Sequence, residues 1–316
     1  MKPLAATAAF LLFTGAASAD CASAREAWDA QAPVTPVSEL IRKARGLRDL
    51  GCDPEVVRTA LQATSSLAAR RASSLLQSGE AEQAEALLDS APLMHWEVLA
   101  MRGALATRRG AFDEAARAYN LALDTLGAAD VTAQNPGLEP AVPRLVALAQ
   151  EAMLVSGSTR ATIRVDGSVS GVMRALELGL RGGTEGDAYN VVASASGGID
   201  RILLPLRFEP GTDRLTRESE EEARALAGYL RGLPSGIPLR IVGHTDAEGP
   251  SLENRILSLE RAEAVRDYLE GRGVGAVIRV DGRGGEDQPR ILEQGIYTPE
   301  QQRLIARRIE VIFENE

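Results

Sequence analysis

Helical periodicity dominates the first half of the chain. Apolar residues recur there every three or four positions, and the helix-favouring residues alanine, leucine, arginine and glutamate are abundant. This pattern predicts an amphipathic helix over 37–50. Asp53 followed by Pro54 is typical of an N-cap and a first helical position, so a second helix is expected to begin there. Another helix is predicted over 143–154.

The segment from Trp96 to Leu126 places small and large residues on either side of a turn at 110–113, namely Leu99, Gly103, Ala115, Tyr119 and Ala122. These positions match the packing positions of a tetratricopeptide repeat, which the segment resembles. A weaker copy precedes it, with Gly79, Ala84 and Leu88 after a helix predicted over 61–77. The two copies are roughly 31 residues apart, against about 34 in regular repeats. Because fewer than three repeats rarely fold alone, a small helical bundle remains the alternative.

From about residue 201 the pattern changes to alternating strands and helices. Strands are predicted over 202–208, 238–243, 276–280 and 308–313, and helices over 215–230, over 251–269 and, briefly, from 298. Such alternation predicts a mixed sheet with helices packed on it. The expected fold class is therefore α+β, with an α-helical N-terminal region and a C-terminal βαβαβ-α-β domain.

Between these regions lies a glycine-rich connector, 158–200. Three short apolar stretches, 161–165, 176–180 and 189–195, are separated by glycines. We expect a β-rich connector, and the pattern leaves a small hairpin subdomain and a partly ordered linker both open. A separate loop is expected over 128–140.

The first residues have the pattern of a signal peptide. A basic start is followed by an apolar run too short to span a bilayer, and 17–19 reads Ala-Ser-Ala, a typical cleavage site. Because Asp20 precedes Cys21, a lipoprotein anchor is not favoured, and no integral membrane segment is expected in the mature chain. An uncleaved N-terminal anchor is the alternative. The predicted domains are 1–19, the signal peptide; 20–157, helical; 158–200, the connector; and 201–316, the α+β domain.

Export changes the interpretation of the two cysteines, Cys21 and Cys52. In an oxidising compartment they suggest a disulfide, which would add roughly 3 kcal/mol by closing a loop of about thirty residues. Free thiols or metal ligation are the alternatives. The two histidines, His95 and His244, lie far from both cysteines in the sequence, so neither a metal site nor a cofactor is expected.

The chain is acidic, with a net charge of -9 over 316 residues. Nucleic acids select basic surfaces, so nucleic-acid binding is not expected. The sequence also lacks the common signatures of serine hydrolases, zinc proteases, P-loop proteins and dinucleotide enzymes, which argues against an enzyme. Any anionic ligand must be recognised locally by a few placed residues.

A dense motif follows the second predicted strand. It comprises Gly243-His244-Thr245-Asp246, Gly249, Asn254, Leu257-Ser258, Arg261-Ala262 and Val265. This spacing resembles the OmpA-like peptidoglycan-binding family, whose pattern is G-H-T-D-x-x-G and then N-x-x-L-S-x-x-R-A-x-x-V. Downstream, Gly282, Gly284, Pro289 and Arg307-Arg308-Ile309-Glu310 resemble further family positions. The resemblance covers about one third of the chain.

Asp246 and Arg261 carry the candidate chemistry. Asp246 follows a strand end, where α/β sheets place ligand sites, and Arg261 shares a helix face with buried positions. From the residues alone, a structural salt bridge between them is as good an interpretation as a ligand site. The resemblance implies that they hold diaminopimelate of the peptidoglycan stem peptide, Asp246 at its ammonium and Arg261 at its carboxylate.

The resemblance adds three further candidates. Asn254 either caps its helix, the favoured interpretation, or orients the site; Thr212 and Arg308 stand at other family positions. Two positions depart from the family pattern: Pro210 removes a backbone donor beside the site, and Ala306 replaces an asparagine.

Together these features predict a non-catalytic periplasmic protein that binds peptidoglycan through an OmpA-like domain, while its helical half docks a protein partner. A peripheral association with the outer membrane is left open. The alternative is a periplasmic scaffold protein whose OmpA-like domain has lost its ligand.

Overall fold

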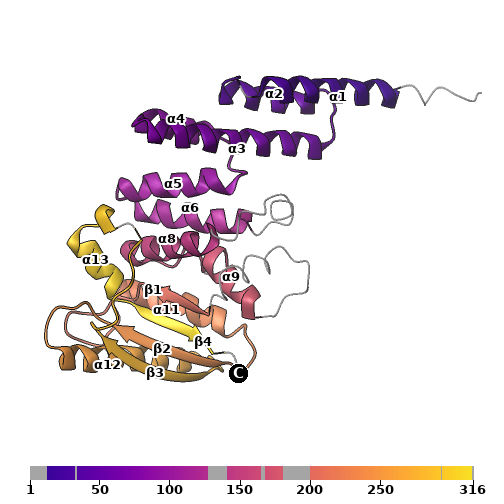
Figure 1. The fold of residues 1–316 in the computed structure, drawn as a ribbon. Coiled ribbons are helices and arrows are strands. Elements are labelled where there is room, and N and C mark those ends of the chain that lie inside the picture. The colour runs from indigo at the N-terminus through magenta and orange to yellow at the C-terminus, as the bar shows by residue number, and fades with distance from the viewer. Residues whose placement is uncertain are drawn as a thin grey trace, which may run out of the picture. The chain divides into compact units, whose positions relative to one another are not determined.

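The computed structural model describes residues 13–32, 34–126, 141–164, 168–180, 200–292 and 294–314. Most of the predicted signal peptide, the loop expected over 128–140 and the apolar stretch 189–195 lie outside these residues. The chain divides into two compact units, 1–102 and 103–316, and each is described by itself (Figure 1).

Unit 1–102 is helical. Its elements are α1 (Phe13–Gln31), α2 (Val37–Asp49), α3 (Pro54–Gln77), α4 (Ala81–Ser90) and the start of α5 (Trp96–Arg108). The core includes Trp28, Leu40, Leu47 and Val57, drawn from the first three helices. Asp53 caps α3 as predicted, because its carboxylate accepts the backbone N–H of Glu55 at 2.8 Å. The helices predicted before and after Leu61 form one continuous helix, α3.

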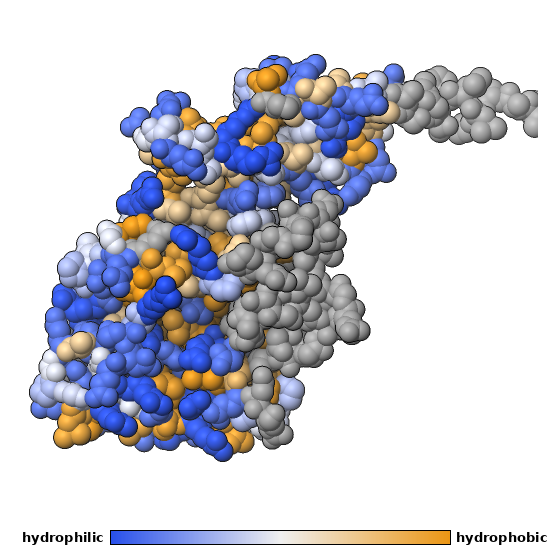
Figure 2. All heavy atoms as spheres, in the orientation of Figure 1, coloured by the Kyte–Doolittle hydropathy of each residue, from blue (hydrophilic) through white to orange (hydrophobic). Residues whose placement is uncertain are grey.

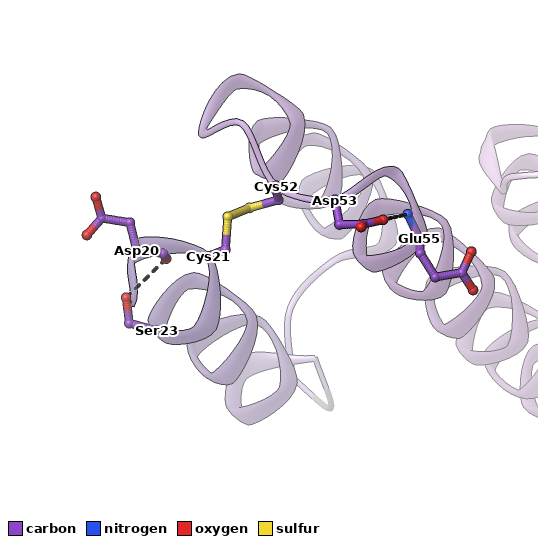
Figure 3. The surroundings of a disulfide bond; sticks show 6 residues. All are labelled: Asp20, Cys21, Ser23, Cys52, Asp53 and Glu55. Atoms are coloured by element: carbon purple, nitrogen blue, oxygen red, sulfur yellow. Dashed lines mark hydrogen bonds between the residues drawn. A yellow bond between two sulfur atoms is a disulfide. The ribbon is translucent and has the colours of Figure 1, made fainter. Parts of the chain in front are cut away.

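Cys21 and Cys52 form a disulfide, which confirms the predicted pairing (Figure 3). The bond joins α1 to the turn between α2 and α3. It closes a separation of 31 residues, with Cα atoms 5.6 Å apart. Arg71 of α3 adds a polar tie, donating to the carbonyl oxygens of Thr35 at 2.7 Å and Ala32 at 3.1 Å. The first helices are therefore fixed covalently as well as by packing.

Unit 103–316 combines helices with one sheet. Its elements after α5 are α6 (Phe112–Leu126), α8 (Ala141–Ser156), α9 (Gly171–Leu180), β1 (Arg201–Leu204), α11 (Arg217–Leu230), β2 (Pro238–His244), α12 (Ser251–Glu270), β3 (Val277–Gly284), η1 (Gln294–Ile296), α13 (Pro299–Ala306) and β4 (Ile309–Phe313). The α-helical first half and the α+β C-terminal region agree with the predicted fold class.

The four strands form a mixed sheet in the order β1-β4-β2-β3. β4 pairs antiparallel with β1 and β2, whereas β2 and β3 are parallel. β1 is shorter than the predicted strand 202–208, because Pro205 has no N–H to continue the ladder. α11 and α12 cover one face of the sheet, where the alternating residues Ile309, Val311 and Phe313 enter a common core with both helices.

α8 packs on the other side of the sheet. Leu154 of α8 forms a cluster with Tyr297 and Ile305, and Leu203 of β1 packs against it. α8 also packs along α6. The helix predicted over 143–154 therefore belongs to the same compact unit as the sheet.

The described part of the connector contains little β structure. Ile163 and Val169 form an isolated antiparallel bridge, but the apolar stretch 176–180, grouped with strands in the prediction, belongs to helix α9. α9 is fixed by side chains of α6: Asn120 and Asp124 each accept a backbone N–H of its first turn at 2.9 Å. Val172, Met173 and Leu176 of this helix are fully buried.

Gly103 and Tyr119 explain the close contact between α5 and α6. A Cβ at position 103 would lie 2.7 Å from the Tyr119 ring, so only glycine leaves room for this fully packed aromatic side chain. One small and one large residue singled out in the sequence, Gly103 and Tyr119, thus pack against each other. Its membership in the tetratricopeptide family stays a prediction.

The surface of the described residues is mainly polar on the face drawn in Figure 2, where hydrophobic residues are interspersed among hydrophilic ones. Within the ranges that the structure describes, no helix is both long and apolar enough to cross a bilayer.

Candidate functional site

The candidate site lies where β2 ends and α12 begins. Gly243 lets the helix approach the strand, because a Cβ there would lie 1.9 Å from the carbonyl oxygen of Ser258. Beyond it, the His244 N–H donates to the Arg308 carbonyl and the Thr245 N–H to the Gly284 carbonyl. These bonds hold the end of β2 between its neighbours and fix the direction of the next residue, Asp246.

Asp246 is only 9% exposed, and both of its carboxylate oxygens are engaged. Oδ1 accepts the backbone N–H of Glu248 at 3.0 Å, and Oδ2 accepts Nε of Arg307 at 2.5 Å. Arg307 follows α13 and is 39% exposed as a side chain. The sequence did not identify Arg307 as a site residue, although it stands in the closing motif that carried the family resemblance.

Arg261 is held by backbone and aromatic contacts instead of by a carboxylate. Its Nε donates to the Thr212 carbonyl at 3.0 Å, and its guanidinium lies over the Phe208 ring at 4.9 Å. Within the described ranges its two terminal amino groups have no hydrogen-bond or ion-pair partner. The Asp246–Arg261 salt bridge considered as an alternative is therefore not formed.

The charge environment of Arg261 is unusual for a half-buried cation. Burial is the main reason why its pKa is lowered, and the positive charge of Arg307 lowers it further. The negative charges of Asp246 and Asp213 oppose this shift. A guanidinium that is desolvated but not neutralised by a carboxylate is well suited to receive an anionic group.

A cavity of about 340 Å³ brings the candidates together. Asp246, Arg261, Asn254 and Arg308 all line it, and apolar walls come from Leu206, Phe208, Leu257 and Leu304. Thr212 is not a lining residue, but its carbonyl positions Arg261. The cavity thus offers both signs of charge beside an aliphatic surface.

Asn254 does not cap α12, contrary to the favoured interpretation. The helix begins at Ser251 after Pro250 and has no side-chain cap, so Asn254 already lies inside the first turns. Its amide donates to the Glu248 carbonyl at 2.8 Å. Asn254 therefore fixes the loop that follows Asp246.

Thr212 and Arg308 are both engaged within the chain. The Thr212 N–H donates to the Glu209 carbonyl, so in this structure that N–H is occupied. Arg308 is only 4% exposed and donates to the Glu310 carboxylate and to the carbonyls of Ala306 and Asp287. Both residues support the cavity wall through these internal bonds.

A buried charged group lies beneath the cavity. His244 is 3% exposed, and its Nε2 lies 3.3 Å from Oε1 of Glu310 without the geometry of a hydrogen bond. Burial raises the pKa of Glu310, but the neighbouring His244 ring and Arg308 guanidinium outweigh it and lower the pKa to about 2. The carboxylate is therefore held ionised against the end of β2.

Arg207 is a second arginine that the sequence did not single out. It donates to the Leu304 carbonyl at 3.2 Å and to that of Leu154, and it lines the cavity. Burial and then repulsion from Arg307 lower its pKa to about 10. The sequence did contain a signal for Arg207, because an arginine inside the apolar run 202–208 needs buried hydrogen-bond acceptors.

The part of the chain that the structure describes contains no group of three or more histidine, cysteine or acidic residues that could hold a metal ion.

A known family matches part of the C-terminal region. Residues 207–293 match the model of the OmpA family. The peptidoglycan-associated lipoprotein of Haemophilus influenzae is 31% identical over 126 residues, which cover 38% of this chain and 82% of that protein. Among solved structures, the periplasmic domain of Helicobacter pylori MotB is 20% identical, with 37% of this chain and 74% of that chain covered and a TM-score of 0.31. The OmpA-like domain of FopA1 from Francisella tularensis is 14% identical, covering 37% and 75%, with a TM-score of 0.27.

Proposed function

Because the chain belongs to the OmpA family, we propose that it is a non-catalytic periplasmic protein that binds peptidoglycan by holding the diaminopimelate of stem peptides. The relative from Haemophilus influenzae is named for its association with peptidoglycan. The signal-peptide pattern and the disulfide support a location outside the cytoplasm.

The observation that carries this proposal is the free edge of Arg261. Its terminal amino groups have no partner among the described residues, while Asp246 lines the same cavity. The amino-acid head of diaminopimelate carries an ammonium and a carboxylate close together. A forked guanidinium binds a carboxylate bidentately, and an aspartate complements the ammonium.

The apolar walls suit the rest of the ligand. Leu257 and Leu304 line the cavity beside the charged groups, so they offer a surface for the methylene chain of diaminopimelate. Because the whole chain is acidic, general electrostatic attraction does not favour the carboxylate-bearing wall. Binding in this proposal depends on the local charges of the cavity.

Sedimentation with isolated sacculi tests the proposal. We expect the mature protein to pellet with sacculi and soluble diaminopimelate to release it. Asp246→Ala and Arg261→Ala should each reduce pelleting. Arg266→Ala, on the same helix but paired with the exposed Asp267, is the matched control and should pellet like the wild type. A wild type that stays in the supernatant would favour the alternative, a scaffold protein without the ligand.

The proposed partner-docking role of the helical half is supported by a groove in unit 1–102. It measures about 350 Å³ between α3 and α5 and is lined by Ala69, Arg70, Ser73, Trp96, Glu97, Ala100 and Met101. A photoreactive residue at position 73 should give a specific adduct in the periplasm, and one at the exposed position 253 should not give the same adduct. Identical patterns from both positions would contradict this role.

A further inference from the structure

The carboxylate that would receive a ligand's ammonium is already occupied. Oδ1 of Asp246 accepts the Glu248 N–H at 3.0 Å, and Oδ2 is bonded by Arg307 at 2.5 Å. The Glu248 bond is part of the backbone turn and stays in place. An arriving ammonium must therefore share or replace the guanidinium of Arg307.

Arg307 has a second anionic partner within reach. Its Nη1 lies 3.6 Å from Oε1 of Glu300, on the first turn of α13. Glu300 is exposed and also bonds Arg303 at 2.7 Å. Because the Arg307 side chain is 39% exposed, it can turn from Asp246 towards Glu300 without crossing the packed core. Leaving Asp246 thus does not leave the guanidinium without a counter-charge.

Two of the arginines that line the cavity, Arg307 and Arg261, are in different states. Arg307 neutralises Asp246, whereas the terminal amino groups of Arg261 have no partner within the described ranges. In this state the cavity offers a carboxylate-binding edge, while its ammonium-binding group is already paired with a cation. Binding a ligand's ammonium therefore requires Arg307 to share or leave Asp246. Binding its carboxylate requires no such change at Arg261.

We propose that Arg307 is a displaceable internal counter-ion of Asp246, which turns to Glu300 when a ligand ammonium enters the cavity. This inference rests on the proposed function and adds a specificity-determining residue to it. The contribution of the ammonium to binding is the difference between two ion pairs with Asp246, that of the ligand and that of Arg307. Arg307 thereby weakens the binding of amino-bearing ligands relative to simple carboxylates.

Two ligands separate the charges: meso-diaminopimelate, and pimelate, which has the same chain and carboxylates but no amino group. Both are titrated against the full mature chain by NMR, and the ratio of their affinities is measured. In Arg307→Gln the affinity ratio of diaminopimelate to pimelate should rise by roughly threefold to tenfold, the effect of removing one partly exposed competing charge.

A second variant tests the alternative partner. In Glu300→Gln, Arg307 has lost its second anion and should stay on Asp246, so the same ratio should fall. Both side chains are accessible to solvent, Arg307 at 39% and Glu300 at 55% exposure. Arg272→Gln, a surface arginine that stacks on Tyr268 outside the cavity, is the matched control and should leave the ratio unchanged.

The outcomes distinguish this inference from the proposed function. If the wild type binds diaminopimelate and needs both Asp246 and Arg261, but Arg307→Gln lowers the ratio or changes both affinities equally, Arg307 is not displaced and the inference is wrong. If the wild type binds neither ligand, the proposed function fails and the inference fails with it.

Discussion

Arg307, and not Arg261, is the ion-pair partner of Asp246, with 2.5 Å between Nε and Oδ2. The arginine of the family motif instead lies over Phe208 and donates to the Thr212 carbonyl. One motif arginine is thus left available, and the aspartate is balanced by a residue 61 positions further along the chain. The partner of Asp246 is therefore determined by how the chain folds and not by the spacing of the motif.

The free edge of Arg261 leads to a prediction about its geometry. Arg261→Lys keeps the charge but loses the planar fork that bonds a carboxylate twice, so diaminopimelate affinity should fall by about 1–2 kcal/mol. Calorimetric titration would measure this. Thermal stability should change little, because no carboxylate within the described ranges relies on this side chain. Unchanged affinity in the lysine variant would show that the fork is not used.

The ionised Glu310 predicts an acid dependence of stability. Its folded pKa, about 2, lies below the ordinary value of 4.5, so its contribution is fully present above that ordinary value and is lost as the pH falls towards 2. The contribution is on the order of 3 kcal/mol. Denaturant unfolding between these pH values would measure it. Glu310→Gln should be less stable at neutral pH, since Arg308 loses its partner, and should change less with acid; an equally steep acid dependence would contradict this role.

The disulfide predicts local stabilisation of the first helices. Cys21→Ser with Cys52→Ser should lower the stability of α1 and α2 by about 3 kcal/mol. Hydrogen exchange of their amides would show this. The reduced wild type is the control, because Cys52 is buried and a serine in its place has an effect of its own. Exchange in β2 and β4, in the other compact unit, should be unaffected. Equal protection with and without the bond would rule out this stabilisation.

Gly103 predicts a steric effect with a matched control. Gly103→Ala would place a Cβ 2.7 Å from the Tyr119 ring, so overpacking should cost about 1–3 kcal/mol of unfolding free energy. Gly228 lies within helix α11 with nothing near its Cβ position, and Gly228→Ala should instead stabilise by roughly 0.5–1 kcal/mol. Chemical denaturation compares the two. Stabilisation by both changes would refute the packing role of Gly103.

The sequence predicted the features that depend on local pattern. Asp53 capped its helix, a short helix followed Thr298, and the residues of the spaced motif, Asp246, Arg261 and Asn254, line one cavity. These features are set by neighbours a few positions apart, or by a pattern in which many positions agree.

Features that depend on distant neighbours could not be predicted in this way. The Asp246–Arg307 pair requires knowing that the end of α13 returns to the end of β2. The helical state of 176–180 depends on acceptors that α6 supplies, and short apolar runs do not distinguish a strand from a helix. Asn254 had a capping residue type, but the helix began three residues earlier.

The position of α8 determines which fragment of this protein could be studied alone. A fragment that began at residue 201 would uncover Tyr297 and Ile305, which pack against Leu154. It would also leave two polar groups without acceptors: the Arg207 guanidinium without the Leu154 carbonyl, and the Leu292 N–H without the Glu151 carboxylate, which it reaches at 2.8 Å. Arg207 lines the cavity that contains Asp246 and Arg261, so truncation at residue 201 would disturb the cavity itself. A fragment from residue 103 onward retains these partners. It is therefore the shorter fragment in which ligand binding at the cavity should be measured.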